Sequence, residues 1–258
     1  MEKNSIFLKK DNNIGWIILN QPNKRNAISK SMWERIPFLL DEVQNDKNIK
    51  AIVIRGVGNE IFAAGADISE FGEIHSDKET SIEYNKTILE AEKLLTNFPK
   101  PSIAMIHGAC VGGGCGLALA CDFRFGDQNS KFSIPPANLG LVYSLHSTKL
   151  LIDKVGPSIA KDMLYSARFV SCNEAQKIRL LDKVFDIKDL ESKTIEYCNN
   201  ISKKSSFTIK SSKKIIQMIL NGKTDDDSET INLFNSAFEG DDYKEGTRAF
   251  MEKRKTKF

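Results

Sequence analysis

Short apolar runs alternate with segments of helical character through the first half of this 258-residue chain. Runs rich in β-branched residues at 14–19, 51–55 and 103–106 predict buried strands, and a further strand is expected at 122–126. Helices are expected at 29–43, 76–97 and 113–121. The first of these helices has Ser29 as its N-cap and Pro37 in its interior. This alternation predicts an α/β fold whose sheet is mostly parallel and covered by helices on both faces.

The second half of the chain has a different pattern. Beyond residue 147 it predicts helices at 149–155, 157–166 and 173–178, followed by long Lys- and Ser-rich segments. A break within 190–205 suggests two parts, an α/β core over 1–195 and a helical C-terminal region over 196–258. The composition, 41% hydrophobic and 28% charged, is that of an ordinary globular protein. A net charge of +3 gives no reason to expect a nucleic-acid partner.

Cysteine and histidine usage bears on location and metal binding. The five cysteines are an odd number without a C-x-x-C pair, which favours a reduced, cytoplasmic protein. No apolar run approaches 18 residues and the first ten residues lack the apolar core of a signal peptide, so we expect no membrane span or leader. The three histidines are scattered, so we expect no metal site. Cys115 is open to two interpretations, packing in an apolar stretch or nucleophilic catalysis.

Two loops have the composition of sites that bind an anion through backbone N–H groups. Gly112-Gly113-Gly114 opens a helix, whose first N–H groups lack intrahelical partners and lie at the positive end of the helix dipole. The stretch 62–68 (FAAGADI) joins a strand to a helix, and its small residues let a ligand approach closely. Together they can form an oxyanion hole. The alternative is that the glycines only permit close packing. The spacing fits neither G-x-G-x-x-G nor G-x-x-x-x-G-K, which excludes nicotinamide and P-loop sites.

Five segments, in order along the chain, resemble the motifs of the crotonase (enoyl-CoA hydratase/isomerase) superfamily. They are 20–27 (NQPNKRNA), 62–68, 107–115 (HGACVGGGC), 169–175 (FVSCNEA) and 243–254 (YKEGTRAFMEKR). The resemblance implies a crotonase-like spiral of ββα units with a helical C-terminal region that builds homotrimers or hexamers. It also implies an acyl-CoA thioester as substrate, with coenzyme A entering as part of that substrate and no separate cofactor.

The resemblance assigns residues to roles. Ala66 and Gly113 are expected to supply the two N–H groups of an oxyanion hole for a thioester enolate. The coenzyme A nucleotide is expected to lie along these two residues and the following ones: Lys24, Arg25, Ala27, Ala64, Gly65, Asp67 and Ile68. Phe250 and Lys253 are expected to reach a coenzyme A that in many members is bound to a neighbouring subunit. A Lys253 ammonium beside the 3′-phosphate would make a charge-assisted contact, whereas the alternative is a solvated basic tail.

The pattern breaks at the two positions where hydratases of the superfamily carry glutamates. Here they are Gly116 and Pro136, and neither can transfer a proton, although hydration needs both a base and an acid. The loop 132–143 (FSIPPANLGLVY) instead resembles that of methylmalonyl-CoA decarboxylases, in which a tyrosine matching Tyr143 lies over the substrate. Loss of CO₂ leaves an enolate, which needs the oxyanion hole but no general base. Those enzymes tend to carry histidine where this chain has Ala66, which weakens the match.

Three interpretations follow. The leading one is an acyl-CoA lyase of decarboxylase type, with Tyr143 either over the substrate or only packed. In the first, His146 is a candidate to substitute as a polar group for the histidine of the decarboxylases, the alternative being a helix-start or surface residue. The second is an enoyl-CoA hydratase or isomerase with relocated acid–base groups, for which Glu60 and Glu70 are candidates. The third is a non-catalytic protein that binds CoA thioesters. Ser144 stands where dienoyl isomerases place an aspartate, which argues against that activity.

Overall fold

A six-stranded sheet forms the centre of the protein. The computed structural model describes residues 5–258. The prediction made for the first ten residues, that they form no leader, therefore falls in part on residues 1–4, which lie outside the described residues. The strand order is β1-β2-β3-β5-β7-β10. The bounds are β1 Ile6–Asp11, β2 Ile14–Leu19, β3 Ala51–Gly56, β5 Ser102–Ile106, β7 Phe123–Asp127 and β10 Lys183–Phe185. All neighbours pair in parallel except β1 and β2, which form an antiparallel hairpin. The mostly parallel sheet is therefore confirmed.

The four strands predicted from apolar runs correspond to β2, β3, β5 and β7. The sequence analysis did not predict β1, because its second half (Lys9, Lys10, Asp11) is charged and exposed at the edge of the sheet. The tight connection to β2 is possible because Asn12 adopts φ +52°, a conformation that asparagine tolerates.

A second, smaller sheet carries the loops of interest. Its order is β4-β6-β8-β9, with bounds Ile61–Ala63, Ala109–Val111, Lys131–Ser133 and Val170–Ser171. β4, β6 and β8 run parallel, so the segments that follow β4 and β6 leave the sheet at the same edge. The register pairs Ala63 with Cys110, and this brings the loop 64–68 beside the turn at Gly112.

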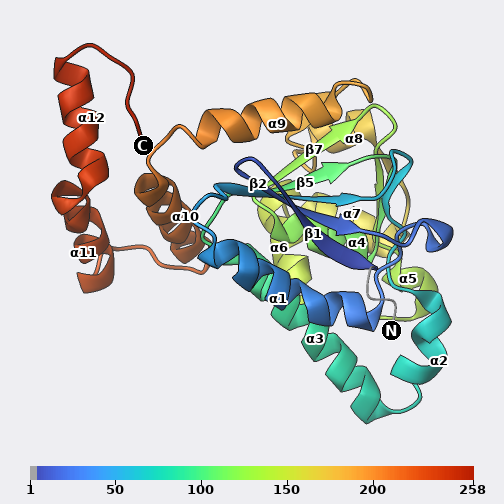
Figure 1. Cartoon of the computed structure of the whole chain (residues 1–258). Helices are drawn as coiled ribbons and strands as arrows, with labels where there is room; N and C mark the ends of the chain where they lie inside the picture. The colour runs from blue at the N-terminus through green and yellow to red at the C-terminus, as the bar shows by residue number, and fades with distance from the viewer. Residues whose placement is uncertain (1–4) are drawn as a thin grey trace.

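Helices cover both faces of the main sheet (Figure 1). Those of the core are α1 Lys30–Asn45, α2 Phe71–Ile74, α3 Lys78–Thr96, α4 Gly113–Ala120, α5 Pro136–Leu139, α6 Leu145–Val155, α7 Pro157–Ser166, α8 Cys172–Lys177 and α9 Leu190–Ile201. Ser29 caps α1 as predicted, accepting the N–H of Met32. The larger hydrophobic cluster unites α1, α3, α4 and α6, and a smaller one, centred on Phe125 and Leu190, lies between the sheet and α9.

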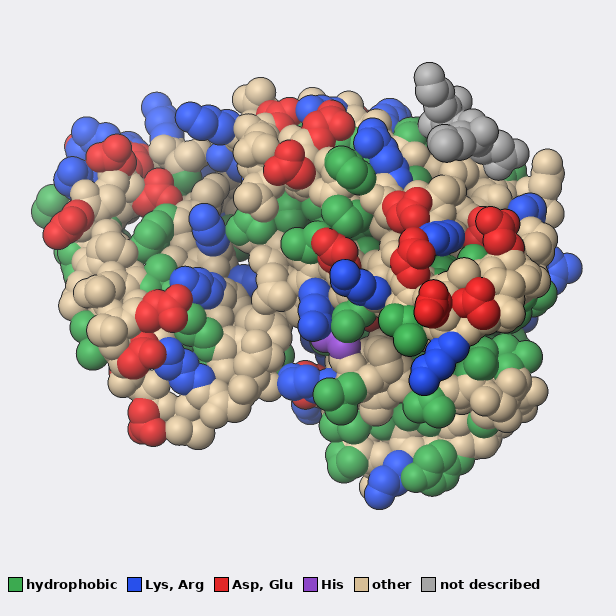
Figure 2. Space-filling model, turned by 90° about the horizontal axis from the view of Figure 1, so that it is seen from below, with side chains coloured by type: hydrophobic (Ala, Val, Ile, Leu, Met, Phe, Trp, Pro, Cys, Tyr) green, Lys and Arg blue, Asp and Glu red, His purple; other side chains and the backbone are tan. Residues whose placement is uncertain are grey.

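The C-terminal helices extend away from this core. They are α10 Ser206–Leu220, α11 Ser228–Ser236 and α12 Asp241–Met251. Figure 1 shows α11 and α12 at the left, away from the sheet. Figure 2 shows them as a lobe separated from the core by a hollow, with acidic and basic side chains mixed on both parts of this face. Because α9 is continuous over 190–201 and packs on the sheet, the change in packing comes at 202–205 rather than at residue 195.

Candidate active site

Two backbone N–H groups meet where the loops after β4 and β6 leave the small sheet. The nitrogen of Ala66 lies 3.9 Å from the position of a Cβ atom built on Gly113. Within residues 5–258, no backbone acceptor is bonded to the N–H of Ala66 or to that of Gly113, the first residue of α4. The two N–H groups therefore lie near each other without a backbone acceptor, as two donors to one ligand oxygen would.

Three backbone hydrogen bonds hold the loop 64–68 in place. The Arg25 carbonyl accepts from Ala64, Gly65 accepts from Ile28, and Ile28 accepts from Asp67. These bonds use the N–H groups of Ala64 and Asp67 and the carbonyl of Gly65, so none of them uses the N–H of Ala66. Gly65 has φ +108°, a conformation that side chains rarely adopt, so glycine is needed there. The loop is thus fixed while the N–H of Ala66 donates to no backbone acceptor among the described residues.

The turn before α4 requires glycine for both its conformation and its packing. Gly112 has φ +52°, which directs the chain from β6 into the helix. A Cβ on Gly114 would lie 2.8 Å from the Cβ of Ala63, so α4 could not approach β4 as closely with any other residue. Both interpretations of the glycine run therefore apply: Gly114 permits close packing, while Gly113 presents a free N–H.

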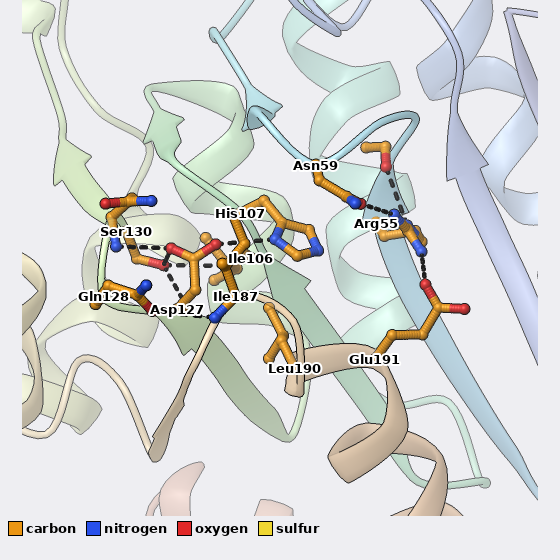
Figure 3. A network of polar contacts seen from close by, with 12 residues as sticks. Arg55, Asn59, Ile106, His107, Asp127, Gln128, Ser130, Ile187, Leu190 and Glu191 are labelled. Atoms are coloured by element: carbon orange, nitrogen blue, oxygen red, sulfur yellow. Dashed lines mark hydrogen bonds and ion pairs between the residues drawn. The ribbon is translucent and has the colours of Figure 1, made fainter.

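A buried network fixes the strand end that leads into this turn (Figure 3). Nδ1 of His107 lies 2.9 Å from Oδ2 of Asp127, and both side chains are buried. Ser130 donates to the carbonyl of Ile106 at 2.9 Å, and Asp127 accepts the N–H of Asn129. These contacts join the ends of β5 and β7 directly before Gly108. His107 therefore positions the backbone.

Tyr143 lies next to the turn, as the sequence comparison implied. Its hydroxyl donates to the carbonyl of Gly112 at 3.4 Å, and its ring packs against the core. Burial raises the pKa of the Tyr143 phenol well above its ordinary value, and the carboxyl of Glu92 raises it further. The phenol therefore stays protonated at neutral pH, and its proton is directed to the Gly112 carbonyl.

Glu92 of α3 is the residue that the sequence analysis missed. Its side chain is only 2% exposed, and a Cβ built on Gly116 would collide with its Oε1. The Tyr143 hydroxyl oxygen lies 3.2 Å from the same Cβ position. Gly113 and Gly116 are three residues apart and share one face of α4. The carboxyl of Glu92 thus fills the space that a side chain at position 116 would occupy, one turn from the oxyanion hole.

The surroundings of Glu92 favour its neutral form. Burial raises the pKa of the carboxyl to about 7, although a hydrogen bond from Ser147 opposes the shift. The Ser147 hydroxyl donates to Oε2 at 2.7 Å. A carboxyl with a pKa near neutrality exchanges a proton readily in either direction, as acid–base catalysis requires. The signal in the sequence was that Glu92 lies on the buried face of α3, four residues after Ile88 and three before Leu95.

The other residues that the sequence offered as replacements for the missing catalytic groups lie elsewhere or have other partners. Oε2 of Glu70 accepts the N–H of Lys30 at the start of α1, and Glu60 is exposed. Burial lowers the pKa of His146, and the charges that add to the shift are Lys93 and Lys149 rather than Glu92. Pro136 begins α5 and provides no acid–base group. Among the candidate carboxyls, only Glu92 reaches the space beside Gly116.

The residues assigned to the nucleotide divide into two groups. Nζ of Lys24 lies 2.7 Å from Oδ2 of Asp67, whose buried carboxyl has its pKa lowered by hydrogen bonds from Lys24 and Ser69 that outweigh desolvation. Ala27 is buried, while Arg25 and Ile68 are exposed. The loop 64–68 and Lys24 are therefore in one place. Phe250, 85% exposed, and Lys253 lie at the end of α12, away from the loop within this chain.

Cysteine side chains take no part in the described site. All five are free and buried. The Cys115 thiol donates to the carbonyl of Cys110 at 2.9 Å, on the interior side of α4. This contact supports the packing interpretation of Cys115. Residues 5–258 contain no cluster of three His, Cys, Asp or Glu side chains suited to a metal ion, and none of their helices is long and apolar enough to cross a membrane.

Comparison with known proteins identifies the family. The family described as enoyl-CoA hydratase/isomerase matches residues 9–258. The chain belongs to the enoyl-CoA hydratase/isomerase family. Its fold is that of other members: an enoyl-CoA hydratase/isomerase family protein from Hyphomonas neptunium superposes with a TM-score of 0.96 at 37% identity, over 98% of this chain and 97% of the other. The expected crotonase-like α/β fold is confirmed.

Relatives of this chain in the family are named for different reactions. The chain is 31% identical to a short-chain-enoyl-CoA hydratase from Clostridium acetobutylicum, over 99% of this chain and 97% of that protein. It is 29% identical to a methylmalonyl-CoA decarboxylase from Escherichia coli, over 96% and 95%. Family membership supports an enzyme that acts on an acyl-CoA. The reaction has to be argued from the site.

Proposed function

We propose that this protein binds an acyl-CoA thioester, stabilises its enolate with the N–H groups of Ala66 and Gly113, and moves a proton at C2 with Glu92. The observation that carries the proposal is the Glu92 carboxyl in the space beside Gly116. An enolate oxygen between the two N–H groups would carry the developing negative charge. A carboxyl with a pKa of about 7 would remove or return the C2 proton.

The number of acid–base groups favours a double-bond shift as the reaction. Hydration needs one group to activate water and another to protonate C2. The described site gathers one carboxyl, Glu92, and a phenol, Tyr143, whose raised pKa makes it a poor base. One carboxyl is enough for an isomerase, because the proton removed at C2 of a 3-enoyl-CoA is delivered to C4 by the same group. Glu92 thus supports the interpretation with a relocated acid–base group.

Decarboxylation is the second candidate, and Tyr143 is the observation that favours it. The Tyr143 hydroxyl donates its one proton to the Gly112 carbonyl over a long 3.4 Å, and turning that proton toward the ligand would let the phenol orient a substrate carboxylate. After loss of CO₂, protonated Glu92 would supply the proton to the enolate carbon. A carboxylate at Glu92 would repel the substrate carboxylate, so this reaction requires the protonated form.

The coenzyme A moiety is proposed to lie along Lys24, Arg25 and the loop 64–68. Phe250 and Lys253 are too far from this loop in their own chain, so we propose that they contact a coenzyme A bound to a neighbouring subunit of a trimer or hexamer. The exposed apolar residues of the C-terminal helices, among them Phe234, Phe238 and Met251, are consistent with such an assembly. The buried free thiols fit a cytoplasmic enzyme.

A panel of thioesters tests the proposal. The purified protein is incubated with 3-hexenoyl-CoA, crotonyl-CoA, methylmalonyl-CoA and malonyl-CoA, and the products are followed by mass spectrometry. We expect 2-hexenoyl-CoA from the first substrate. CO₂ release from methylmalonyl-CoA that falls on Tyr143→Phe substitution would support the second candidate. Rapid hydration of crotonyl-CoA would contradict both, and coenzyme A binding without any turnover would indicate the non-catalytic interpretation.

A further inference from the structure

The two carboxyl oxygens of Glu92 face different surroundings. Oε1 points to the space beside Gly116 and Tyr143, where the substrate is proposed to bind. Oε2 accepts a hydrogen bond of 2.7 Å from the Ser147 hydroxyl. Apart from Ser147, no side-chain partner is assigned to this carboxyl among residues 5–258. One oxygen is therefore available for the reaction, while the other has a hydroxyl neighbour.

The hydroxyl of Ser147 connects in turn to the surface. Its Oγ lies 2.7 Å from Oγ of Ser144. Ser147 is buried, at 3% exposure, whereas Ser144 is exposed and is the N-cap of α6. The N-cap role orients Ser144, because its Oγ accepts the N–H of Ser147 at 3.0 Å and is left with its own proton to donate. A continuous line of hydroxyl groups thus leads from solvent to a carboxyl that is only 2% exposed.

We propose that Ser144 and Ser147 form a proton relay between solvent and Glu92. The proposal rests on the proposed role of Glu92 as the acid–base group. When Oε1 gives its proton to substrate carbon, Oε2 receives the proton of Ser147, Ser147 receives that of Ser144, and Ser144 receives one from water. Each hydroxyl gains one proton and loses one, so both end neutral. In the reverse direction, the oxygen that took a proton from substrate turns toward Ser147 by rotation of the carboxyl about its Cγ–Cδ bond, and the proton then passes through Ser147 and Ser144 to water.

The relay has a chemical consequence that an isolated carboxyl would lack. A buried carboxyl without an exchange route returns to the substrate the same hydrogen that it removed. A carboxyl connected to solvent exchanges that hydrogen before it is returned. Deuterium at C2 of a 3-enoyl-CoA is therefore expected to appear in water, rather than at C4 of the product.

The test is the fate of deuterium during isomerisation of C2-deuterated 3-hexenoyl-CoA. Mass spectrometry of the product gives the ratio of deuterium lost to deuterium transferred. We expect Ser147→Ala to lower this ratio by about tenfold or more, because the first hydroxyl of the relay is gone. Ser147→Thr keeps a hydroxyl and is expected to restore the ratio. The ratio is independent of how much enzyme is active, so a purely structural effect of the substitution would not change it.

The matched control is Thr194→Val, which removes a buried hydroxyl from α9, on the other face of the sheet. Its ratio should equal that of the wild type. An unchanged ratio in Ser147→Ala, or an equal change in Thr194→Val, would overturn the relay.

A second assay separates the relay from the isomerase proposal. Exchange of the C2 hydrogens of butyryl-CoA in D₂O requires only enolate formation and proton exchange. We expect the wild type to exchange these hydrogens, Ser147→Ala to exchange them about tenfold more slowly, and Ser147→Thr to recover the rate. This result would support the relay even if no double-bond shift occurs, and in that case only the isomerase proposal fails. Absence of exchange by the wild type, or exchange that is insensitive to Ser147→Ala, overturns the relay.

Discussion

The carboxyl of Glu92 and the missing side chain of Gly116 are complementary. Oε1 of Glu92 lies where the Cβ of any larger residue at position 116 would be, so the glutamate of α3 can approach α4 only because residue 116 is glycine. Gly116 therefore does more than remove a carboxyl from α4. It makes room for a carboxyl that comes from a different helix.

Substitution of Gly116 by alanine is expected to displace the Glu92 carboxyl. The new methyl group would meet both Oε1 and Cδ of Glu92, the latter at 3.3 Å. We expect turnover to fall by at least about tenfold and the free energy of unfolding by about 1–3 kcal/mol, the usual cost of overpacking. Urea denaturation and steady-state kinetics measure the two effects.

A double-mutant cycle isolates the contact between residues 92 and 116. Gly116→Ala should cost much less stability in a Glu92→Ala background, where the space is open. Gly72→Ala is the control, because a Cβ there meets no atom within 4 Å. Equal costs of Gly116→Ala in both backgrounds would show that the two residues do not compete for one space.

The raised pKa of Glu92 predicts how stability depends on pH. The folded pKa is about 7 and the ordinary value is 4.5, so the folded state holds the proton more tightly than the unfolded state. This contribution to stability is fully present below pH 4.5, is lost as pH rises through 7, and amounts to about 3 kcal/mol. Between pH 5 and pH 8 the free energy of unfolding of the wild type should therefore fall relative to that of Glu92→Gln, because the amide cannot titrate. Urea unfolding of both proteins at the two pH values measures this difference. A parallel pH dependence of the two proteins would contradict the buried, protonated carboxyl.

The oxyanion hole can be tested by removing one donor. Gly113 is the first residue of α4, a position that tolerates proline, so Gly113→Pro deletes the N–H with little damage to the helix. We expect kcat to fall by about 10²–10³-fold. Gly113→Ala keeps the N–H and adds a methyl 3.4 Å from the Trp33 ring and 3.9 Å from the Ala66 nitrogen, so it measures the effect of added bulk and should lose less activity than Gly113→Pro. Equal losses in the two variants would indicate a packing effect instead.

The fold and the position of the two glycine-containing loops were predictable from the sequence because they depend on local pattern. Apolar runs gave β2, β3 and β5, and the glycines at 112–114 marked the start of α4. Those signals lie within a few residues of the features that they predict. The charged edge strand β1 was missed, since half of its side chains face solvent and resemble a loop.

Glu92 was not predictable in the same way. It comes from a helix some twenty residues before the turn, and its approach to Gly116 depends on how α3 packs against α4. The motifs show only that position 116 lacks a carboxyl. A glutamate among the apolar residues of α3 was visible, but one buried charged residue on a helix does not reveal what it faces. Glu60 and Glu70 were the carboxyls that the sequence offered as candidates for a relocated acid–base group, and we propose Glu92 for that role instead.

The pH dependence of the rate distinguishes the two candidate reactions. Removal of a C2 proton needs the Glu92 carboxylate, so kcat/KM for isomerisation should rise with pH and level off above about 7. Decarboxylation would use the protonated form, and its kcat/KM should instead decline above about 7. Rates measured from pH 5 to pH 9 with 3-hexenoyl-CoA and with methylmalonyl-CoA give the two profiles. A flat profile for the active substrate would remove Glu92 from the proton-transfer step.

The most direct test of the central claim is the value of kcat/KM for Glu92→Gln with 3-hexenoyl-CoA. The amide keeps the shape of the side chain and can still accept the Ser147 hydrogen bond, but it cannot carry the proton. We predict a loss of at least about 10²-fold, the usual contribution of a general acid–base group. Glu90→Gln, an exposed position two residues earlier on α3, should remain close to the wild type. Isomerisation by Glu92→Gln at the rate of the wild type would contradict the assignment of Glu92 as the acid–base group.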